Sequence, residues 1–324
     1  MIDIKLLEQL CLCNGISGDE GNVRNLIINE IKDCADDIKT DNLGNLIVFK
    51  KGKKSAKSKL MVSAHMDEVG LMVTDITSDG YLKFDEVGGI DRRVLPGKRV
   101  CVGRNGLNGV IGVKPIHLTN GDEKTAVPKM NDMYIDIGAE SREDALKYVN
   151  YGDGINFEGD FKINGKTVVT KALDDRFGCY VLINLIKSEP EYDMYFTFVV
   201  QEEVGLRGAR PAAFTVNPDF ALVIESTTAA DVAEVDVSHQ VCNLSKGATV
   251  TVMDRATVYD KEMISAAFEL AEKNNIAVQY KRAVAGGNAP STAANLDDCE
   301  SVLKLAKVLS DYIAGGNLAK GKTV

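Results

Sequence analysis

Three short apolar runs, far apart along the chain, each end in side chains that can hold a metal ion. His65 directly follows the run Leu60–Ala64. Two adjacent glutamates come just after the run Tyr195–Val200, and Glu225 ends the run Ala221–Ile224. Short apolar runs of this kind are typical of buried strands. Because ligands gather at the carboxyl ends of strands in layered α/β sheets, we expect these side chains to converge.

Helical and strand patterns alternate in the first and last parts of the chain, which predicts an α/β layer fold with a mixed sheet. From about residue 75 to 165 short β-rich segments alternate instead with glycine turns, and only Arg142–Tyr148 has a helical pattern. This middle part predicts a small β-barrel or sandwich. We therefore predict a discontinuous α/β domain at 1–74 and 166–324, interrupted by an inserted β-barrel domain at 75–165. The predicted helices are 3–13, 21–36, 173–186, 261–273 and 296–313, and the predicted strands include 46–49, 60–64, 195–201, 220–224, 248–253 and 276–280.

Charge and cysteine content narrow the class of protein. The formal net charge is −9, and an acidic surface argues against nucleic acid or an anionic membrane as the main partner. The seven cysteines are odd in number and scattered, which favours reduced thiols in a cytosolic protein. The N-terminus has no basic segment followed by a long apolar core, and no apolar run has membrane-spanning length. These features predict a cytoplasmic protein.

His65 and Asp67 form the first candidate pair. Side chains alternate along an extended chain, so the two lie on one face, where the aspartate could orient the imidazole toward a metal ion. Taken alone, a histidine that follows a strand is more often structural.

Asp174 and Asp175 form the second pair, at the predicted start of a helix. The simpler interpretation is capping of the helix N-terminus, where carboxylates interact favourably with the helix dipole.

Glu202 and Glu203 form the third pair, with Glu225 and Asp231 as further candidates. Two acidic residues at the end of a buried strand are costly unless a positive group meets them. One glutamate could bind a metal ion while its neighbour acts as a general base. Carboxylates together with a histidine suit zinc, cobalt or manganese.

Four motifs in this order resemble those of the tetrahedral aminopeptidases, which are dinuclear metallopeptidases also called glutamyl or deblocking aminopeptidases, some of them labelled endoglucanases. The resemblance covers residues 3 to 312. The motifs are AHMDEVGLMV, KALDDRFGCYVL, QEEVGLRGA and VIESTTAADV, supported by VKPIHL around His117 and VMDRATVYD at 252–260. The resemblance implies a metal-dependent aminopeptidase acting on short peptides, with an inserted barrel that supports assembly of dimers into a dodecamer.

The resemblance also implies a set of ligands for two divalent metal ions. His65 and Glu225 would hold the first ion and Glu203 the second, and Asp174 would bridge both. Two such ions can lower the pKa of a bound water and polarise a peptide carbonyl.

Roles for three further residues follow from the same resemblance. Glu202 would be the general base that takes a proton from the metal-bound water. Asp67 would steady His65, and Asp175 would belong to the strained turn after the bridging residue.

One segment departs from the family pattern. In the family, a histidine near the C-terminus, beyond a glycine-rich stretch, also holds the second ion. Here Ala283–Asn288 begins such a stretch, but Ala289 follows at once with what resembles the start of the last helix, and the histidines are only His65, His117 and His239. Three explanations stay open: a real deletion, a printed sequence that lacks residues after Asn288, or replacement of the ligand by another residue. His117 of a neighbouring subunit is one such replacement, whereas His239 is expected at the surface.

Two alternative functions remain. A real deletion would favour a catalytically impaired or inactive assembly subunit that keeps the fold and the first metal ion. A glycan hydrolase could also use a pair of carboxylates, but the chain has no tryptophan to stack against sugars.

Overall fold

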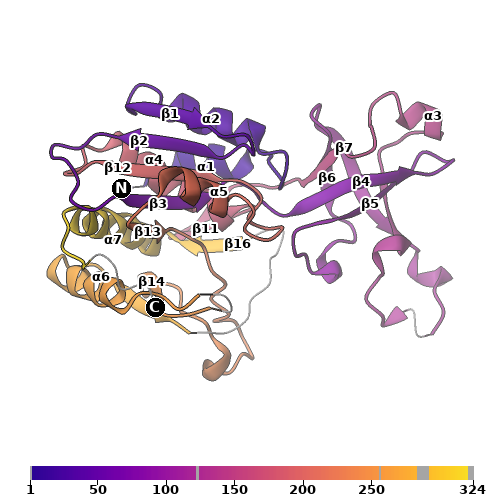
Figure 1. Ribbon diagram of the computed structural model, residues 1–324. Helices are drawn as coiled ribbons and strands as arrows, with labels where there is room; N and C mark the ends of the chain where they lie inside the picture. Colours follow the sequence, from indigo (N-terminus) through magenta and orange to yellow (C-terminus); the bar gives the residue numbers. More distant parts are fainter. Residues whose placement is uncertain (1, 122–123, 255–256, 283–291, 320–324) are drawn as a thin grey trace.

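The computed structural model describes residues 2–121, 124–254, 257–282 and 292–319. The chain forms an α/β lobe and a separate β-barrel lobe (Figure 1). The fold class predicted from the sequence is confirmed. None of the described helices is long and apolar enough to cross a membrane. All seven cysteines are free thiols, three of them buried.

A mixed five-stranded sheet forms the centre of the α/β lobe. β3 (Leu60–His65) lies between β12 (Met194–Val199) and β13 (Phe220–Val223) and is parallel to both. β2 (Leu46–Lys50) pairs antiparallel with β12, and β1 (Asp37–Thr40) pairs antiparallel with β2. Every residue of β3 is buried, so the strand that carries His65 is held on both edges and both faces.

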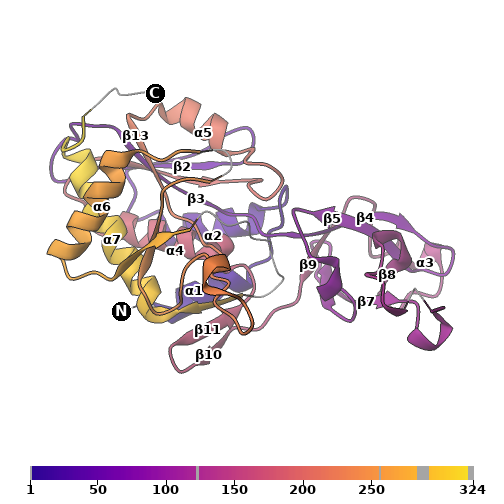
Figure 2. The ribbon, with the colours of Figure 1, turned by 90° about the horizontal axis from the view of Figure 1, so that it is seen from below.

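Helices cover both faces of this sheet. α4 (Leu173–Lys187) packs on β3, and α1 (Ile4–Leu12), α2 (Gly21–Ile31) and α7 (Leu296–Ala314) pack around α4 to form the main core. α5 (Ala209–Val216) covers the opposite face over Ile47 and Met61. A second part of the lobe holds α6 (Lys261–Lys273) and a parallel pair of strands against α7, as Figure 2 shows. Its strands are β14 (Ala248–Thr251) and β15 (Val278–Lys281), and a further sheet holds β10 (Lys162–Asn164), β11 (Thr167–Thr170) and β16 (Thr292–Asn295).

The inserted part of the chain closes into a barrel with its own apolar core, as predicted. Its first strand begins at Gly70 and its last strand ends at Phe157. The division of the chain into domains at residues 75 and 165 stays a prediction. In order around the barrel the strands are β4 (Gly70–Ile76), β5 (Leu82–Val87), β8 (Met133–Asp136), β7 (Leu107–Val113), β6 (Arg99–Val102) and β9 (Gly154–Phe157), with α3 (Arg142–Ala145) beside them.

Several predicted bounds differ from the structure. α2 ends at Ile31 rather than at Asp36, because the chain turns there to begin β1, and the N–H of Asp36 donates to the carbonyl of Phe49. β1 is mostly exposed and polar, so it carries no apolar alternation that would predict a strand. The apolar periodicity of the sequence also did not predict α5, which is a short helix.

A fully buried arginine ties the N-terminal helix to the site-bearing strand. The Nη1 of Arg176 donates to the carbonyls of Leu10 and Cys13, and its Nε donates to the carbonyl of Met66. Its Nη2 lies 3.3 Å from Glu68, which also accepts a hydrogen bond of 2.7 Å from Lys171. These bonds fix the segment that follows His65.

We expect Arg176→Met to lower the free energy of unfolding by about 3–5 kcal/mol, because it leaves Glu68 short of a partner and several buried carbonyls without donors. Urea unfolding followed by circular dichroism measures this loss. Arg104→Met is the control, since that side chain is 88% exposed, and we expect it to change the same free energy by at most about 0.5 kcal/mol. Equal effects of the two substitutions would contradict this role of Arg176.

Candidate metal centre

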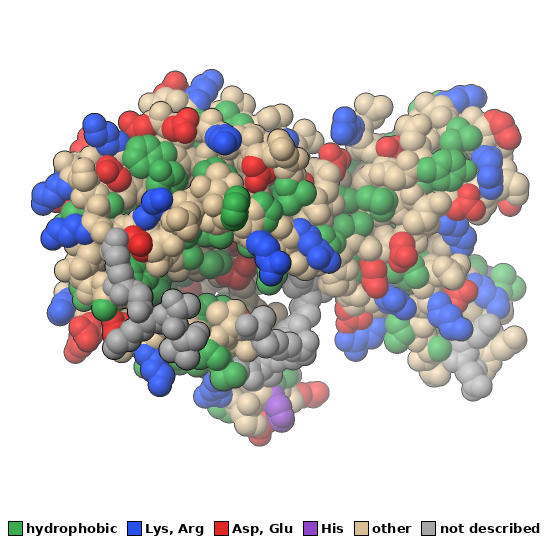
Figure 3. Space-filling model, in the orientation of Figure 1, with side chains coloured by type: hydrophobic (Ala, Val, Ile, Leu, Met, Phe, Trp, Pro, Cys, Tyr) green, Lys and Arg blue, Asp and Glu red, His purple; other side chains and the backbone are tan. Residues whose placement is uncertain are grey.

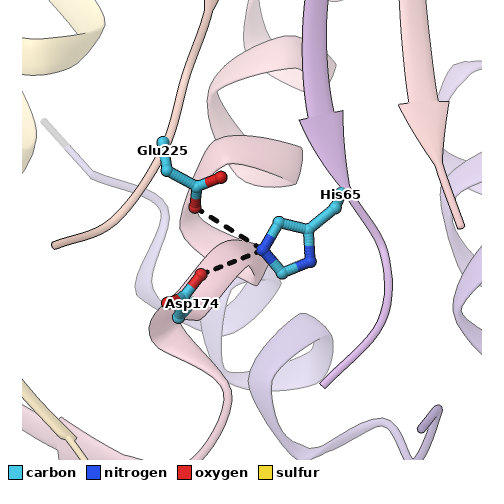
Figure 4. Close-up of side chains that lie close together, drawn as sticks. All are labelled: His65, Asp174 and Glu225. Atoms are coloured by element: carbon cyan, nitrogen blue, oxygen red, sulfur yellow. Dashed lines mark hydrogen bonds and ion pairs between the residues drawn. The ribbon is translucent and has the colours of Figure 1, made fainter. Parts of the chain in front are cut away.

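His65 lies at the carboxyl end of β3 with its ring 2% exposed. Its Nδ1 is 3.0 Å from the carbonyl oxygen of Asp67 and 3.4 Å from the Asp67 carboxylate. Its Nε2 is 2.9 Å from Asp174 and 3.5 Å from Glu225 (Figure 4). The ring is therefore held on one side by Asp67 and faces carboxylates on the other.

Asp174 and Asp175 have separate environments, although they are adjacent. The peptide bond between them is cis, and neither has helical dihedral angles, so regular helix begins only after them. Asp175 is fully buried and accepts hydrogen bonds from the N–H groups of Gly178, at 2.9 Å, and His65, at 3.2 Å. The capping interpretation thus applies to Asp175, whereas Asp174 faces the imidazole.

Glu202 and Glu203 occupy the turn that follows β12. Gln201 precedes them in the left-handed region, with φ of 55°. The Oε2 of Glu202 is 4.0 Å from the Nε2 of His65. The ligand atoms of His65, Glu202 and Glu203 all lie within 4.8 Å of one another, as do those of His65, Asp174 and Glu225.

The structure therefore brings together ligand atoms from the ends of three parallel strands and the start of one helix. Figure 3 shows a hollow on this face of the α/β lobe, between the main sheet and the part that carries α6, with acidic side chains recessed in it. Asp231 belongs to neither ligand group, and its carboxylate accepts the N–H of Leu244 at 2.8 Å. His117 and His239 are exposed on short turns, and neither belongs to these ligand groups. The surface position predicted for His239 is confirmed.

The cluster has the electrostatics of carboxylates held close together. Burial raises the pKa of Glu203 to about 8, and the charge of Asp174 adds to this effect. Withdrawal from water raises the pKa of Glu225 to about 7 even though His65 opposes it. Burial also raises the pKa of Glu202. Two or more carboxylates in one site favour a proton or a cation between them.

The pKa values of His65, Asp67 and Asp174 shift in the direction expected of paired acidic and basic groups. Burial lowers the pKa of His65, but the charge of Glu225 and the hydrogen bond with Asp174 outweigh it, so the net shift is well upward. The pKa values of Asp67 and Asp174 are lowered, because their hydrogen bonds with His65 outweigh burial.

A divalent cation fits this donor set. An imidazole nitrogen with several carboxylate oxygens matches zinc, cobalt or manganese, and the positive charge would replace the protons that the raised glutamate pKa values favour. Both ligand groups include His65, so the described residues offer one nitrogen ligand for the whole centre.

Ser17 also belongs to the surroundings of the centre, and sequence reasoning missed it. Its hydroxyl donates to Asp67 at 2.5 Å. The two residues are fifty positions apart, and no spacing or composition signal in the N-terminal segment points to this contact.

Known proteins resemble this chain in sequence and in fold. The sequence matches the family described as M42 glutamyl aminopeptidase over residues 44–303. A putative aminopeptidase of Acetivibrio thermocellus is 44% identical over 289 residues, which is 89% of this chain and 84% of that protein. The crystal structure of a TET aminopeptidase from a marine sediment Thaumarchaeota archaeon has a TM-score of 0.89 and 30% identity, covering 94% of this chain and 95% of that chain. The Pyrococcus horikoshii TET1 peptidase, which can assemble into a tetrahedron or a large octahedral shell, has a TM-score of 0.82 and 36% identity, covering 96% and 98%.

We expect the thermal midpoint of metal-free protein to fall as the pH rises from about 5 to 8. With pKa values raised in the folded state, Glu203, Glu225 and His65 bind protons more readily folded than unfolded, so their contribution to stability is lost in this direction. The lowered pKa values of Asp67 and Asp174 affect the thermal midpoint only at more acid pH. Differential scanning fluorimetry with and without zinc measures the effect, and Glu203→Gln should flatten the curve. A midpoint that rises with pH in the metal-free protein would contradict the assignment.

Proposed function

Because this chain belongs to the M42 glutamyl aminopeptidase family, we propose that it removes N-terminal residues from short peptides at the centre around His65. The observation that supports this most is that two groups of ligand atoms share His65, one with Asp174 and Glu225 and the other with Glu202 and Glu203. Within each group the ligand atoms lie within 4.8 Å of one another. Enzymes of this family are metal-dependent, and the donor set suits divalent cations.

In our proposal His65 and Glu225 would hold a first cation and Glu203 a second, and Asp174 would contribute to both sites. The cations, when bound, supply a lowered pKa for an attacking water and polarisation of the scissile carbonyl. Asp67 holds the imidazole through its Nδ1 side, which leaves Nε2 directed into the centre.

Glu202 is the proposed general base. Its carboxylate lies in the group with His65 and Glu203, but our proposal does not use it as a ligand. Its side chain is 28% exposed, so a water can reach it. Its raised pKa brings it nearer to the neutral range in which a base and acid work best. Glu202 would accept a proton from the attacking water and deliver it to the leaving amine.

Glu202→Gln should lower the kcat for an aminoacyl anilide by about 10²–10⁴-fold, with bound metal unchanged. The amide keeps the shape of the side chain but cannot accept and return a proton at neutral pH. Steady-state kinetics with added cobalt or zinc measures kcat, and metal analysis of the same samples measures the bound metal. Glu269→Gln, on the exposed face of α6, is the matched control and should retain full activity. Full activity of the Glu202→Gln enzyme would exclude Glu202 as the base.

The alternative function is an impaired or inactive assembly subunit. The stretch after Asn288, where the family histidine is expected, lies outside the described residues. One observation on β13 favours a real deletion. Its apolar run Phe220–Ile224 has no polar alternation, which is typical of a strand buried on both faces, yet the residues of β13 are only half-buried or exposed. Among the described strands β13 also pairs only with β3. Val223 is 56% exposed. Wild-type protein without activity on any aminoacyl anilide, in the presence of metal, would establish this alternative.

We propose that the second cation binds more weakly than the first. The first has the nitrogen of His65, whereas the remaining groups near Glu203 are carboxylates. Residues 283–291 read AVAGGNAPS and contain no histidine, cysteine, aspartate or glutamate, so that stretch offers no replacement of these kinds.

Metal analysis of protein dialysed against metal-free buffer should therefore give about one tightly held cation per chain, and calorimetric titration with zinc should show a second site at least about tenfold weaker. His65→Ala should abolish the tight site, whereas Glu203→Gln should weaken only the second. Two sites of equal affinity would mean that another group, such as His117 of a neighbouring subunit, completes the second site.

We propose further that the chain is a cytoplasmic homo-oligomer, built from dimers into a dodecamer, as the family resemblance implies. The barrel projects from the α/β lobe (Figure 2) and exposes apolar side chains, including Ile116 at 70% and Leu118 at 58%. Exposed apolar groups on a projecting lobe suit contacts between copies. A closed shell would admit short or unfolded peptides.

A further inference from the structure

The turn after β12 is held by three consecutive backbone N–H groups. The N–H of Gln201 donates to Glu20 at 3.1 Å. The N–H groups of Glu202 and Glu203 donate to the two carboxylate oxygens of Asp67, at 3.0 and 3.1 Å. Two carboxylates therefore fix the backbone from which the proposed base and a proposed ligand project.

Both of these carboxylates depend on a short N-terminal segment, Ser17–Glu20. The hydroxyl of Ser17 donates to the Oδ2 of Asp67 at 2.5 Å, the same oxygen that receives the N–H of Glu203. Ser17 is 5% exposed, and Asp67 and Glu20 are buried as well. Hydrogen bonds to a charged oxygen are stronger than those between neutral groups, and burial keeps water from replacing them.

The segment itself is anchored independently of the turn. Ile16 forms a parallel bridge with Glu68, and the N–H of Glu68 donates to the carbonyl of Gly15 at 3.1 Å. Glu20 also accepts the N–H of Gly18 at 2.7 Å, which fixes its carboxylate toward Gln201. Contacts other than those with Asp67 and the turn therefore hold Ser17 and Glu20 in place.

We propose that Ser17 and Glu20 are positioning residues for the reaction, which set where Glu202 and Glu203 stand relative to His65. The inference rests on the proposed function and extends it to the N-terminal segment.

Asp67 is the point through which Ser17 acts. Its carboxylate contacts His65 on one side and the N–H groups of Glu202 and Glu203 on the other. Without the Ser17 hydroxyl one strong donor to Asp67 is lost, so the carboxylate can rotate, and the imidazole and the turn lose their common support. A displacement of a catalytic group by about 1 Å can cost on the order of 100-fold in rate.

The test compares Ser17→Ala with Ser63→Ala. Ser63 is as buried as Ser17, lies on the same strand as His65, and its hydroxyl donates to the carbonyl of Thr197 at 3.4 Å. Its loss therefore also removes a buried hydrogen bond, but one to a backbone carbonyl of a residue with no proposed role in the site. We expect Ser17→Ala to lower kcat by about 10–100-fold with KM changed by less than about twofold. Ser63→Ala should keep the wild-type kcat at a similar thermal midpoint.

Two measurements besides activity support the distinction. Calorimetric titration with zinc should give a dissociation constant about tenfold weaker for Ser17→Ala than for Ser63→Ala. Hydrogen exchange should show faster exchange of the Glu202 and Glu203 amides in Ser17→Ala alone, because their acceptor is no longer fixed.

Glu20→Gln is the second variant, which decides the matter if Ser17→Ala does not fold. It keeps an acceptor oxygen for the N–H of Gln201 but removes the charge, so we expect kcat to fall several-fold and the Gln201 amide to exchange faster. Wild-type kcat, zinc affinity and exchange in both variants would overturn the inference. If wild-type protein is itself inactive, the proposed function fails, whereas the zinc and exchange measurements still test the positioning of the turn.

Discussion

The parallel pairing of β3 with β12 on one edge and β13 on the other places the candidate ligands together. Parallel neighbours end at the same edge of a sheet. His65 at the end of β3 therefore meets the residues that follow Val199 and Val223, although the three lie far apart along the chain. α4 packs on β3 and brings Asp174 to the same edge. A shift of one residue in either pairing would turn alternate side chains to the opposite face and separate the ligands.

Buried charge is concentrated directly beneath this edge. Glu68 pairs there with both Lys171 and Arg176, and backbone carbonyls accept further hydrogen bonds from Arg176. Asp67 is satisfied by Ser17, the turn and His65. Each group would be costly alone and is stable only with its partners present. The centre therefore rests on a paired polar base, while its own carboxylates repel one another until a proton or a cation is bound. That contrast is typical of a functional site, where the cost of local repulsion is borne by the surrounding fold.

Sequence reasoning located the strand ends and their side chains well, because an apolar run followed by ionisable residues is a local pattern. Residue type and spacing alone did not distinguish Asp174 from Asp175, and only the family resemblance gave them different roles. Both stand at the same helix start, and the dihedral angles of the turn direct one toward His65 and the other back to Gly178. Sequence reasoning missed Ser17 and Glu20 because their partners, Asp67 and Gln201, lie 50 and 181 positions away. It also noted Asp231, which shares the acidic chemistry of the ligands but belongs to neither ligand group and accepts the N–H of Leu244 instead.

The amino-acid sequence by itself determined the α/β class, the inserted barrel, the ends of the buried strands and the scarcity of histidine, because each of these depends on residue type and local periodicity. Only the tertiary structure decided which carboxylates face the imidazole, how their pKa values respond to one another, and which N-terminal groups hold the turn of Glu202 and Glu203. These depend on distances across strands and helices, and electrostatic and hydrogen-bond energies change over a few ångströms that sequence spacing does not encode.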